Sequence, residues 1–131
     1  MTQFFKLDTM IILIFLFSCA NVKRNEVIGT YQARNNVNTI DTLKIFENSK
    51  YERSLYRKVD KSLIYKHEGN WHFENGMITL KKFFIDYDKE YSIDKGGFKE
   101  SSMNCTFEVE IIFGRVYVGE KLSGVYLYEK L

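Results

Sequence analysis

The chain has 131 residues, a length that fits a single domain. Its 19 Lys and Arg residues nearly balance its 17 Asp and Glu residues, so the composition gives no basis for a nucleic-acid partner. The 9 Tyr and 11 Phe residues, together with the absence of Pro, favour strands over helices. The sequence contains no internal repeat with a period of about 20–50 residues, so a solenoid is not expected.

The N-terminus has the layout of a bacterial export signal. Lys6 supplies a positive charge, and the apolar run Met10–Phe17 follows it. A transmembrane helix needs about 20 apolar residues, so this run is too short to cross a bilayer. A buried strand of the domain is the alternative. The position of the run, after a cation and before small residues, favours a signal peptide.

The end of this run resembles a known processing motif. Leu16-Phe17-Ser18-Cys19 is similar to the lipobox of bacterial lipoproteins, in which Leu lies three residues before a cysteine that follows a small residue. The resemblance implies cleavage before Cys19 and a diacylglycerol joined to its sulfur, with no other cofactor. Two or three acyl chains hold a protein firmly at a membrane, whereas one holds it only marginally. An ordinary signal peptide with an incidental cysteine is the competing interpretation.

The expected organisation follows from this motif. Residues 1–18 are the predicted signal peptide, 19–26 a lipidated tether and 27–131 the domain. Ala20 and Asn21 lack the Asp that resembles an inner-membrane retention signal, which favours the outer membrane in a Gram-negative cell. Lipidation of Cys19 leaves Cys105 without a disulfide partner, so we expect Cys105 to be a small buried hydrophobe.

The rest of the chain alternates between short strands and turns. Asn75-Gly76 is the strongest hairpin signal, because both residues tolerate the positive φ of a type I′ turn. No helix is expected after residue 19. The pattern predicts an all-β fold, a single antiparallel up-and-down β-barrel of about eight strands. The predicted strands are 27–34, 39–46, 51–59, 63–67, 70–74, 77–87, 105–113, 115–118 and 124–130.

Several short motifs carry a family resemblance. The chain is similar to the small lipocalin-like domains of bacterial lipoproteins, and the similarity covers roughly residues 27 to 85. The resemblance implies a barrel that binds a small apolar molecule. The motifs are Ile28-Gly29-Thr30-Tyr31, Asp41–Ile45, Tyr51-Glu52-Arg53, Gly69-Asn70-Trp71 and Ile78-Thr79-Leu80.

Apolar residues on inward-facing positions form the candidate ligand site. Further aromatic candidates for the interior are Phe83, Phe84 and Phe113. Such side chains either line a cavity or fill a core, and the sequence leaves both alternatives open. The predicted interior consists of Tyr31, Leu43, Ile45, Trp71, Phe73, Phe107, Val109 and Ile111.

No motif for catalysis or metal binding stands out. His67 and His72 are five residues apart, and on one straight strand this odd interval would place them on opposite faces. Gly69, between the predicted strands 63–67 and 70–74, is a candidate break between the two histidines. The acidic segment 86–94 resembles the opening of a calcium loop, but Ser92 stands where that loop needs Gly. We therefore expect no enzyme and no metal site.

Two functions remain open from the sequence. The first is a membrane-anchored, non-enzymatic binding module of the cell envelope, with a small apolar ligand inside the barrel. The second is a packed barrel that binds another envelope protein through its outer face or the 88–104 loop. Ser123-Gly124-Val125-Tyr126 is similar to a stretch of lysozyme-inhibitor lipoproteins, which would make the second function inhibitory.

Overall fold

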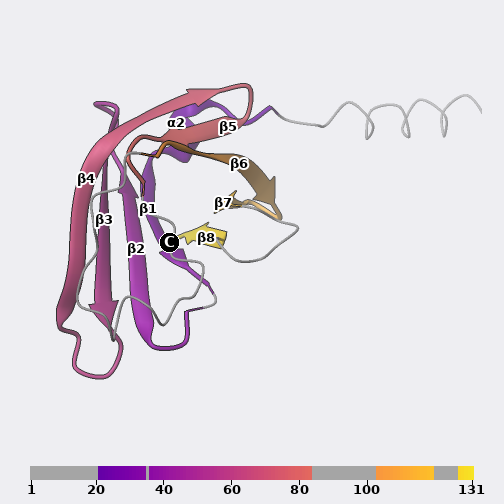
Figure 1. Cartoon of the computed structure of the whole chain (residues 1–131). Coiled ribbons are helices and arrows are strands. Elements are labelled where there is room, and N and C mark those ends of the chain that lie inside the picture. Colours follow the sequence, from indigo (N-terminus) through magenta and orange to yellow (C-terminus); the bar gives the residue numbers. More distant parts are fainter. Residues whose placement is uncertain (1–20, 35, 84–102, 120–126) are drawn as a thin grey trace, which may run out of the picture.

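The computed structural model of the chain is a closed antiparallel barrel (Figure 1). It describes residues 21–34, 36–83, 103–119 and 127–131. Each strand pairs with the next in chain order, and β8 (Leu127–Lys130) returns to pair with β1 (Gly29–Ala33). The predicted all-β, eight-stranded up-and-down barrel is confirmed.

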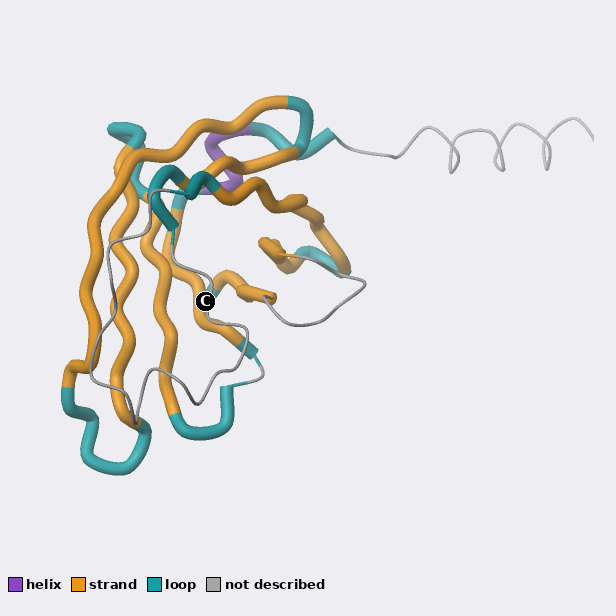
Figure 2. Tube along the Cα trace, viewed as in Figure 1, coloured by secondary structure: helices purple, strands orange, loops and turns teal. Residues whose placement is uncertain are grey.

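The remaining strands follow the predicted order with a few changes of boundary, and the view coloured by secondary structure shows the strands around the barrel (Figure 2). They are β2 (Thr39–Ile45), β3 (Lys50–Arg57), β4 (Leu63–Glu74), β5 (Met77–Leu80), β6 (Cys105–Ile112) and β7 (Arg115–Gly119). The predicted strand 77–87 ends at Leu80, and its residues 84–87 lie outside the described residues, as do residues 124–126.

The expectation of no helix after residue 19 is wrong for one short segment. α2 (Arg24–Val27) is a single turn that covers the end of the predicted tether and the first residue of the predicted domain. The backbone N–H of Lys23 donates to the Glu26 carboxylate over 2.7 Å, and the N–H of Glu26 donates back to the Lys23 carbonyl over 3.0 Å. This reciprocal pair caps the turn, and Val27 is fully buried against the barrel. The end of the predicted tether is therefore ordered and packed against the barrel.

The predicted break at Gly69 is also wrong, because β4 passes through it as one strand. Gly69 pairs with Tyr51 on β3. A Cβ atom at Gly69 would lie 2.5 Å from Cε1 of the Tyr51 ring. The missing side chain lets the aromatic ring lie across β4, so this glycine provides space for packing and does not end the strand.

Two hairpins have two-residue turns with the same backbone. The predicted Asn75-Gly76 turn is present, with φ of 52° and 73°. Phe113 and Gly114 form the matching turn between β6 and β7, with φ of 49° and 76°. Positive φ at both positions is the pattern of a type I′ turn.

The strand order defines two ends of the barrel. The chain enters β1 from α2, so even-numbered strands run back towards α2. The "tether end" therefore carries α2, the turns 46–49, 75–76 and 113–114, and Leu131. The backbone N–H of Leu131 donates to the Thr30 carbonyl over 2.8 Å, and the Lys130 ammonium donates to the Glu26 carbonyl over 2.9 Å. The opposite, far end carries residues 34 and 36–38 and the turn 58–62.

Candidate functional site

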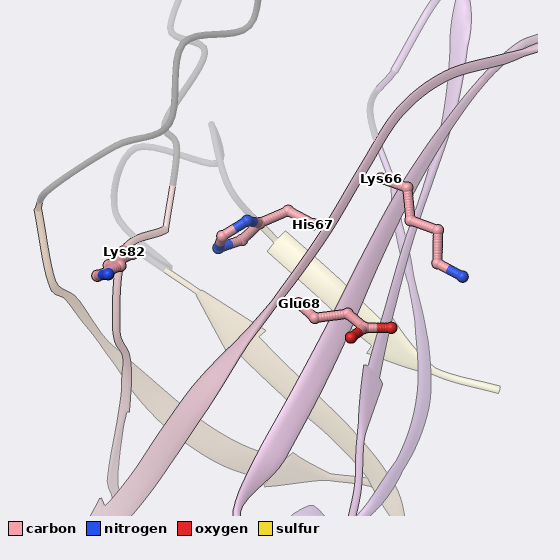
Figure 3. Close-up of a pocket in the computed structure, with 4 residues that line it drawn as sticks. All are labelled: Lys66, His67, Glu68 and Lys82. Carbon is pink, nitrogen blue, oxygen red and sulfur yellow. The ribbon is translucent and has the colours of Figure 1, made fainter.

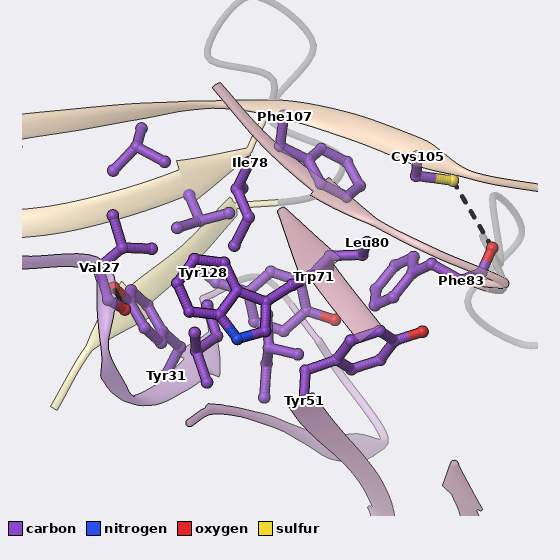
Figure 4. Close-up of a cluster of buried hydrophobic side chains, with 14 of the residues drawn as sticks. Val27, Tyr31, Tyr51, Trp71, Ile78, Leu80, Phe83, Cys105, Phe107 and Tyr128 are labelled. Carbon is purple, nitrogen blue, oxygen red and sulfur yellow. Dashed lines mark hydrogen bonds between the residues drawn. The ribbon is translucent and has the colours of Figure 1, made fainter. Parts of the chain in front are cut away.

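Apolar side chains from all eight strands fill the part of the barrel nearest the tether end (Figure 4). Six of the eight predicted interior residues belong to this core. Phe73 is half-buried and packs against it. The buried core consists of Val27, Tyr31, Leu43, Ile45, Tyr51, Trp71, Ile78, Leu80, Phe83, Cys105, Phe107, Val109, Val116, Val118 and Tyr128.

Ile111 differs from the prediction, because its side chain is 38% exposed. The pairing of β5 with β6 stops at Met77 and Glu108, and the N–H of Val109 donates to the Gly76 carbonyl at the hairpin turn. β6 continues beyond the point where β5 turns back, so no described strand covers Ile111 on that side. Phe113 is also outside the core, since it is fully exposed at the next turn.

The polar atoms of the core aromatics have hydrogen-bond partners. The Tyr31 hydroxyl donates to the Val27 carbonyl over 2.6 Å, and the Tyr51 hydroxyl donates to the Lys81 carbonyl over 2.6 Å. Burial raises the pKa of both phenols above the ordinary 10.0, and for Tyr51 the neighbouring Tyr65 raises it further. The Trp71 indole N–H donates to the Phe46 carbonyl over 2.8 Å. These aromatics are therefore satisfied parts of a packed core.

A buried charged cluster crosses the interior beside this core. Arg53 donates from Nε and Nη2 to the two carboxylate oxygens of Asp41, over 3.1 and 2.8 Å. The Tyr128 hydroxyl donates to the same carboxylate over 2.7 Å, and the guanidinium lies 4.6 Å from the centre of the Phe83 ring. The cluster joins β2, β3 and β8 across the barrel.

The sequence contains a signal for this cluster. A search for alternating apolar residues does not find it, because the residues involved are charged. Asp41 shares its strand face with Leu43 and Ile45, at intervals of two residues, and Arg53 lies on β3 in the same relation to Tyr51 and Leu55. All six positions are buried. Two opposite charges on two neighbouring inward faces therefore indicate a buried ion pair.

A cavity of about 550 Å³ lies against β4, on the far-end side of Trp71. The described residues that line it are Lys66, His67, Glu68 and Lys82. His67 and Lys82 point to one side of β4, whereas the side chains of Lys66 and Glu68 point to the other (Figure 3). None of the predicted interior residues is among the described residues that line this cavity, so the predicted ligand site and the observed cavity are different places.

Strand pairing explains why the cavity opens here. β5 ends opposite Trp71, and among the described residues the last backbone bond along this edge runs from the Lys81 N–H to the Asn70 carbonyl over 2.9 Å. Backbone groups of alternate residues point to the same edge of a strand. The backbones of Glu68 and Lys66 therefore face this edge, and no described strand pairs with them there. Lys66 and Glu68 line the cavity at this edge of β4.

His67 is the inward-facing polar group of the cavity. Its ring stacks on Tyr65, with centroids 6.1 Å apart and 18° between the planes, and it meets Tyr51 edge-on at 5.9 Å. Its Nε2 atom is buried and has no hydrogen-bond partner within the part of the chain that the structure describes. A buried polar nitrogen without a partner is uncommon in folded proteins. The imidazole can donate or accept one hydrogen bond there, according to its tautomer.

The second histidine has a different environment, as the odd interval predicted. His72 is exposed on the outer face, where its Nε2 lies 3.4 Å from the Glu74 carboxylate. In the described part of the chain, no group of three or more His, Cys, Asp or Glu side chains is placed to hold a metal ion. Cys105 is buried, and its Sγ donates to the Phe83 carbonyl over 3.6 Å.

Several predictions fall on residues that lie outside the described residues. They concern the lipidation site Cys19, the acidic segment 86–94, Phe84, residues 88–102 of the 88–104 loop, and the 123–126 motif. Over residues 21–34, 36–83, 103–119 and 127–131, no helix has the length and apolar character needed to cross a membrane.

The fold and site together describe an eight-stranded up-and-down barrel with a packed core at one end and a cavity beside β4. A crystal structure of a lipocalin-like protein from Bacteroides uniformis is similar, with 18% sequence identity and a TM-score of 0.49. The match covers 80% of this chain and 98% of that chain. At this identity the similarity concerns the fold alone. No protein-family model matches the chain, and no curated protein matches it.

Proposed function

We propose that this protein is a lipid-anchored, non-enzymatic binding module of the cell envelope. The anchor is supported by the Leu16-Phe17-Ser18-Cys19 motif after the apolar run Met10–Phe17. The bound lipid is a diacylglycerol on the Cys19 sulfur, and in a Gram-negative cell the membrane is the outer one. An intact mass spectrum of the chain purified from membranes tests this. Acyl mass on a chain that begins at Cys19 is expected, and an unmodified Cys19 would contradict the anchor.

The ligand that the cavity fits best is a small amphiphile with a polar, anionic head. The observation that carries this proposal is the buried Nε2 of His67, which has no hydrogen-bond partner among the described residues and belongs to a ring that lines a cavity of about 550 Å³. That volume is within the range of about 300–1,000 Å³ typical of small-molecule sites. His67 would hydrogen-bond the head, and the exposed Lys82 ammonium on the same side of β4 would attract its charge (Figure 3).

This proposal changes the chemistry expected from the sequence. An entirely apolar ligand inside the barrel would have to displace the packed core, because side chains such as Tyr31, Leu43 and Val118 are fully buried there. Protein interiors are close-packed, and displacing such side chains is costly. An amphiphile at the edge of β4 needs no such rearrangement.

The two histidines give a matched test. Native mass spectrometry of the soluble chain incubated with an envelope lipid extract measures retained ligand mass. The wild type and H72A should retain it, whereas H67A should lose most of it, because His72 lies on the outer face and His67 lines the cavity. Equal retention by H67A and the wild type would place the ligand elsewhere. An extract that leaves every variant free of ligand would contradict small-molecule binding.

A protein partner is the second candidate function. The packed core favours it, since a filled barrel leaves the outer face and the 88–104 loop as contact surfaces. Under this alternative the wild type and both histidine variants carry no small molecule, and crosslinking in cells joins the barrel to another envelope protein.

A further inference from the structure

Phe113 has a backbone conformation that is unfavourable for a bulky side chain. It is the first residue of the β6–β7 turn, with φ of 49°, and its side chain is fully exposed at 103%. The turn at Asn75-Gly76 has the same backbone and lies at the same end of the barrel. Asn is favoured at this position, and a bulky aromatic residue at positive φ is a conformational outlier. The Phe113 side chain therefore adds strain without burial within the described barrel.

The Phe113-Gly114 turn lies at the end of the barrel where the chain enters, and this position indicates what the Phe113 side chain contacts. The chain reaches β1 through residues 21–28 and α2, and the strand order puts the Phe113-Gly114 turn at that same tether end. In Figure 2 the start of the described chain and the β6–β7 turn lie on the right-hand side of the barrel. Asn21, the first described residue, is two residues from Cys19, a separation that spans at most about 7 Å.

We propose that the tether end faces the bilayer and that Phe113 enters its interfacial layer. The inference rests on the proposed lipidation of Cys19, which brings this end of the barrel to the membrane. Ile111, on the same hairpin, is 38% exposed and extends the apolar tip. This orientation directs the far end, and the cavity between it and Trp71, away from the lipid.

The contact is apolar rather than electrostatic. Arg115 follows the turn, but its guanidinium already donates to the Glu129 carboxylate over 2.7 Å. Zwitterionic phosphatidylcholine should therefore suffice, without anionic lipid. An aromatic side chain is suited to this depth, since the interfacial region accepts apolar rings about 5–10 Å below the surface.

Tryptophan fluorescence on phosphatidylcholine vesicles tests the proposal. The mature chain, beginning at Cys19, is coupled through that cysteine to a maleimide lipid. Cys105 is only 6% exposed and should react far more slowly. F113W places a reporter on the turn, and V59W places a matched reporter at a position 92% exposed at the far end. The native Trp71 is 3% exposed, and the chain without an added tryptophan gives its signal for subtraction.

We expect F113W emission to shift to the blue on coupling and to lose intensity when brominated lipids are included. V59W should show neither change. F113W emission that stays unshifted and unquenched, as in V59W, would overturn the proposal. Coupling supplies the tether chemically, so this result does not depend on whether cells acylate Cys19. The mass spectrum of the membrane-purified chain reports that separately.

Discussion

Asp41 and Arg53 form a two-pronged ion pair inside the barrel, with side chains only 4% and 3% exposed. Neither charge can be hydrated if its partner is removed. Breaking a buried pair costs about 3–5 kcal/mol, whereas replacing all of its members by apolar groups costs much less. The pair therefore makes each charge depend on the other, whatever its net contribution to stability.

Urea unfolding of single and combined variants measures this dependence. R53M should lower the free energy of unfolding by about 3–5 kcal/mol. D41L/R53M/Y128F, which also removes the hydroxyl donor, should lose less than R53M and D41L summed. R57A is the control, because the Arg57–Asp60 pair at 3.7 Å is 45% and 52% exposed and should contribute about 0–1 kcal/mol. An R53M cost as small as that of R57A would contradict the prediction.

Features of the fold that depend on local sequence could be predicted, whereas features that depend on contacts between strands could not. The barrel came from alternation and turn residues, which are local: Leu43 and Ile45 share a face, and Asn75-Gly76 makes its own turn. The sequence pattern does not predict that β4 continues through Gly69, because the reason for a glycine there is the Tyr51 ring on the neighbouring strand β3. Cross-strand register fixes that contact, and no local pattern encodes it.

The cavity was missed for a related reason. The prediction took the most apolar inward residues as the ligand site, but these side chains pack against one another. The cavity arises where β5 ends at Leu80 while β4 continues to Leu63. Strand lengths decide this, and the sequence pattern placed the end of β5 beyond Leu80. His67 did carry a signal, since the odd interval to His72 placed the two on opposite faces.

The buried tyrosines make stability fall at alkaline pH. The pKa of Tyr31 and that of Tyr51 are raised in the folded state, above the ordinary 10.0 of the unfolded chain. Above pH 10 the unfolded phenols lose their protons while the folded ones keep them, so unfolding becomes more favourable. Each tyrosine should cost about 1.4 kcal/mol per pH unit once the unfolded form ionises. Below pH 10 this contribution is fully present.

Urea unfolding on either side of pH 10, with phenolate absorbance followed in parallel, measures this loss. Y31F/Y51F should be less stable than the wild type at neutral pH, by about 1 kcal/mol for each lost hydrogen bond. Its stability should fall less steeply with alkaline pH, since it has two fewer phenols to ionise on unfolding. A slope equal to that of the wild type would show that other groups control the alkaline transition.

The matched hairpins allow the strain at Phe113 to be measured inside one protein. F113N should raise the free energy of unfolding by about 1 kcal/mol, because Asn tolerates the left-handed backbone better than Phe. N75F should lower it by a similar amount, since Asn75 has φ of 52° and is exposed. Urea unfolding of both variants and of their combination, in which the effects should nearly cancel, measures the two terms. A loss of stability in F113N would mean that the phenyl ring supports the fold, and Phe113 would then need no membrane contact to explain it.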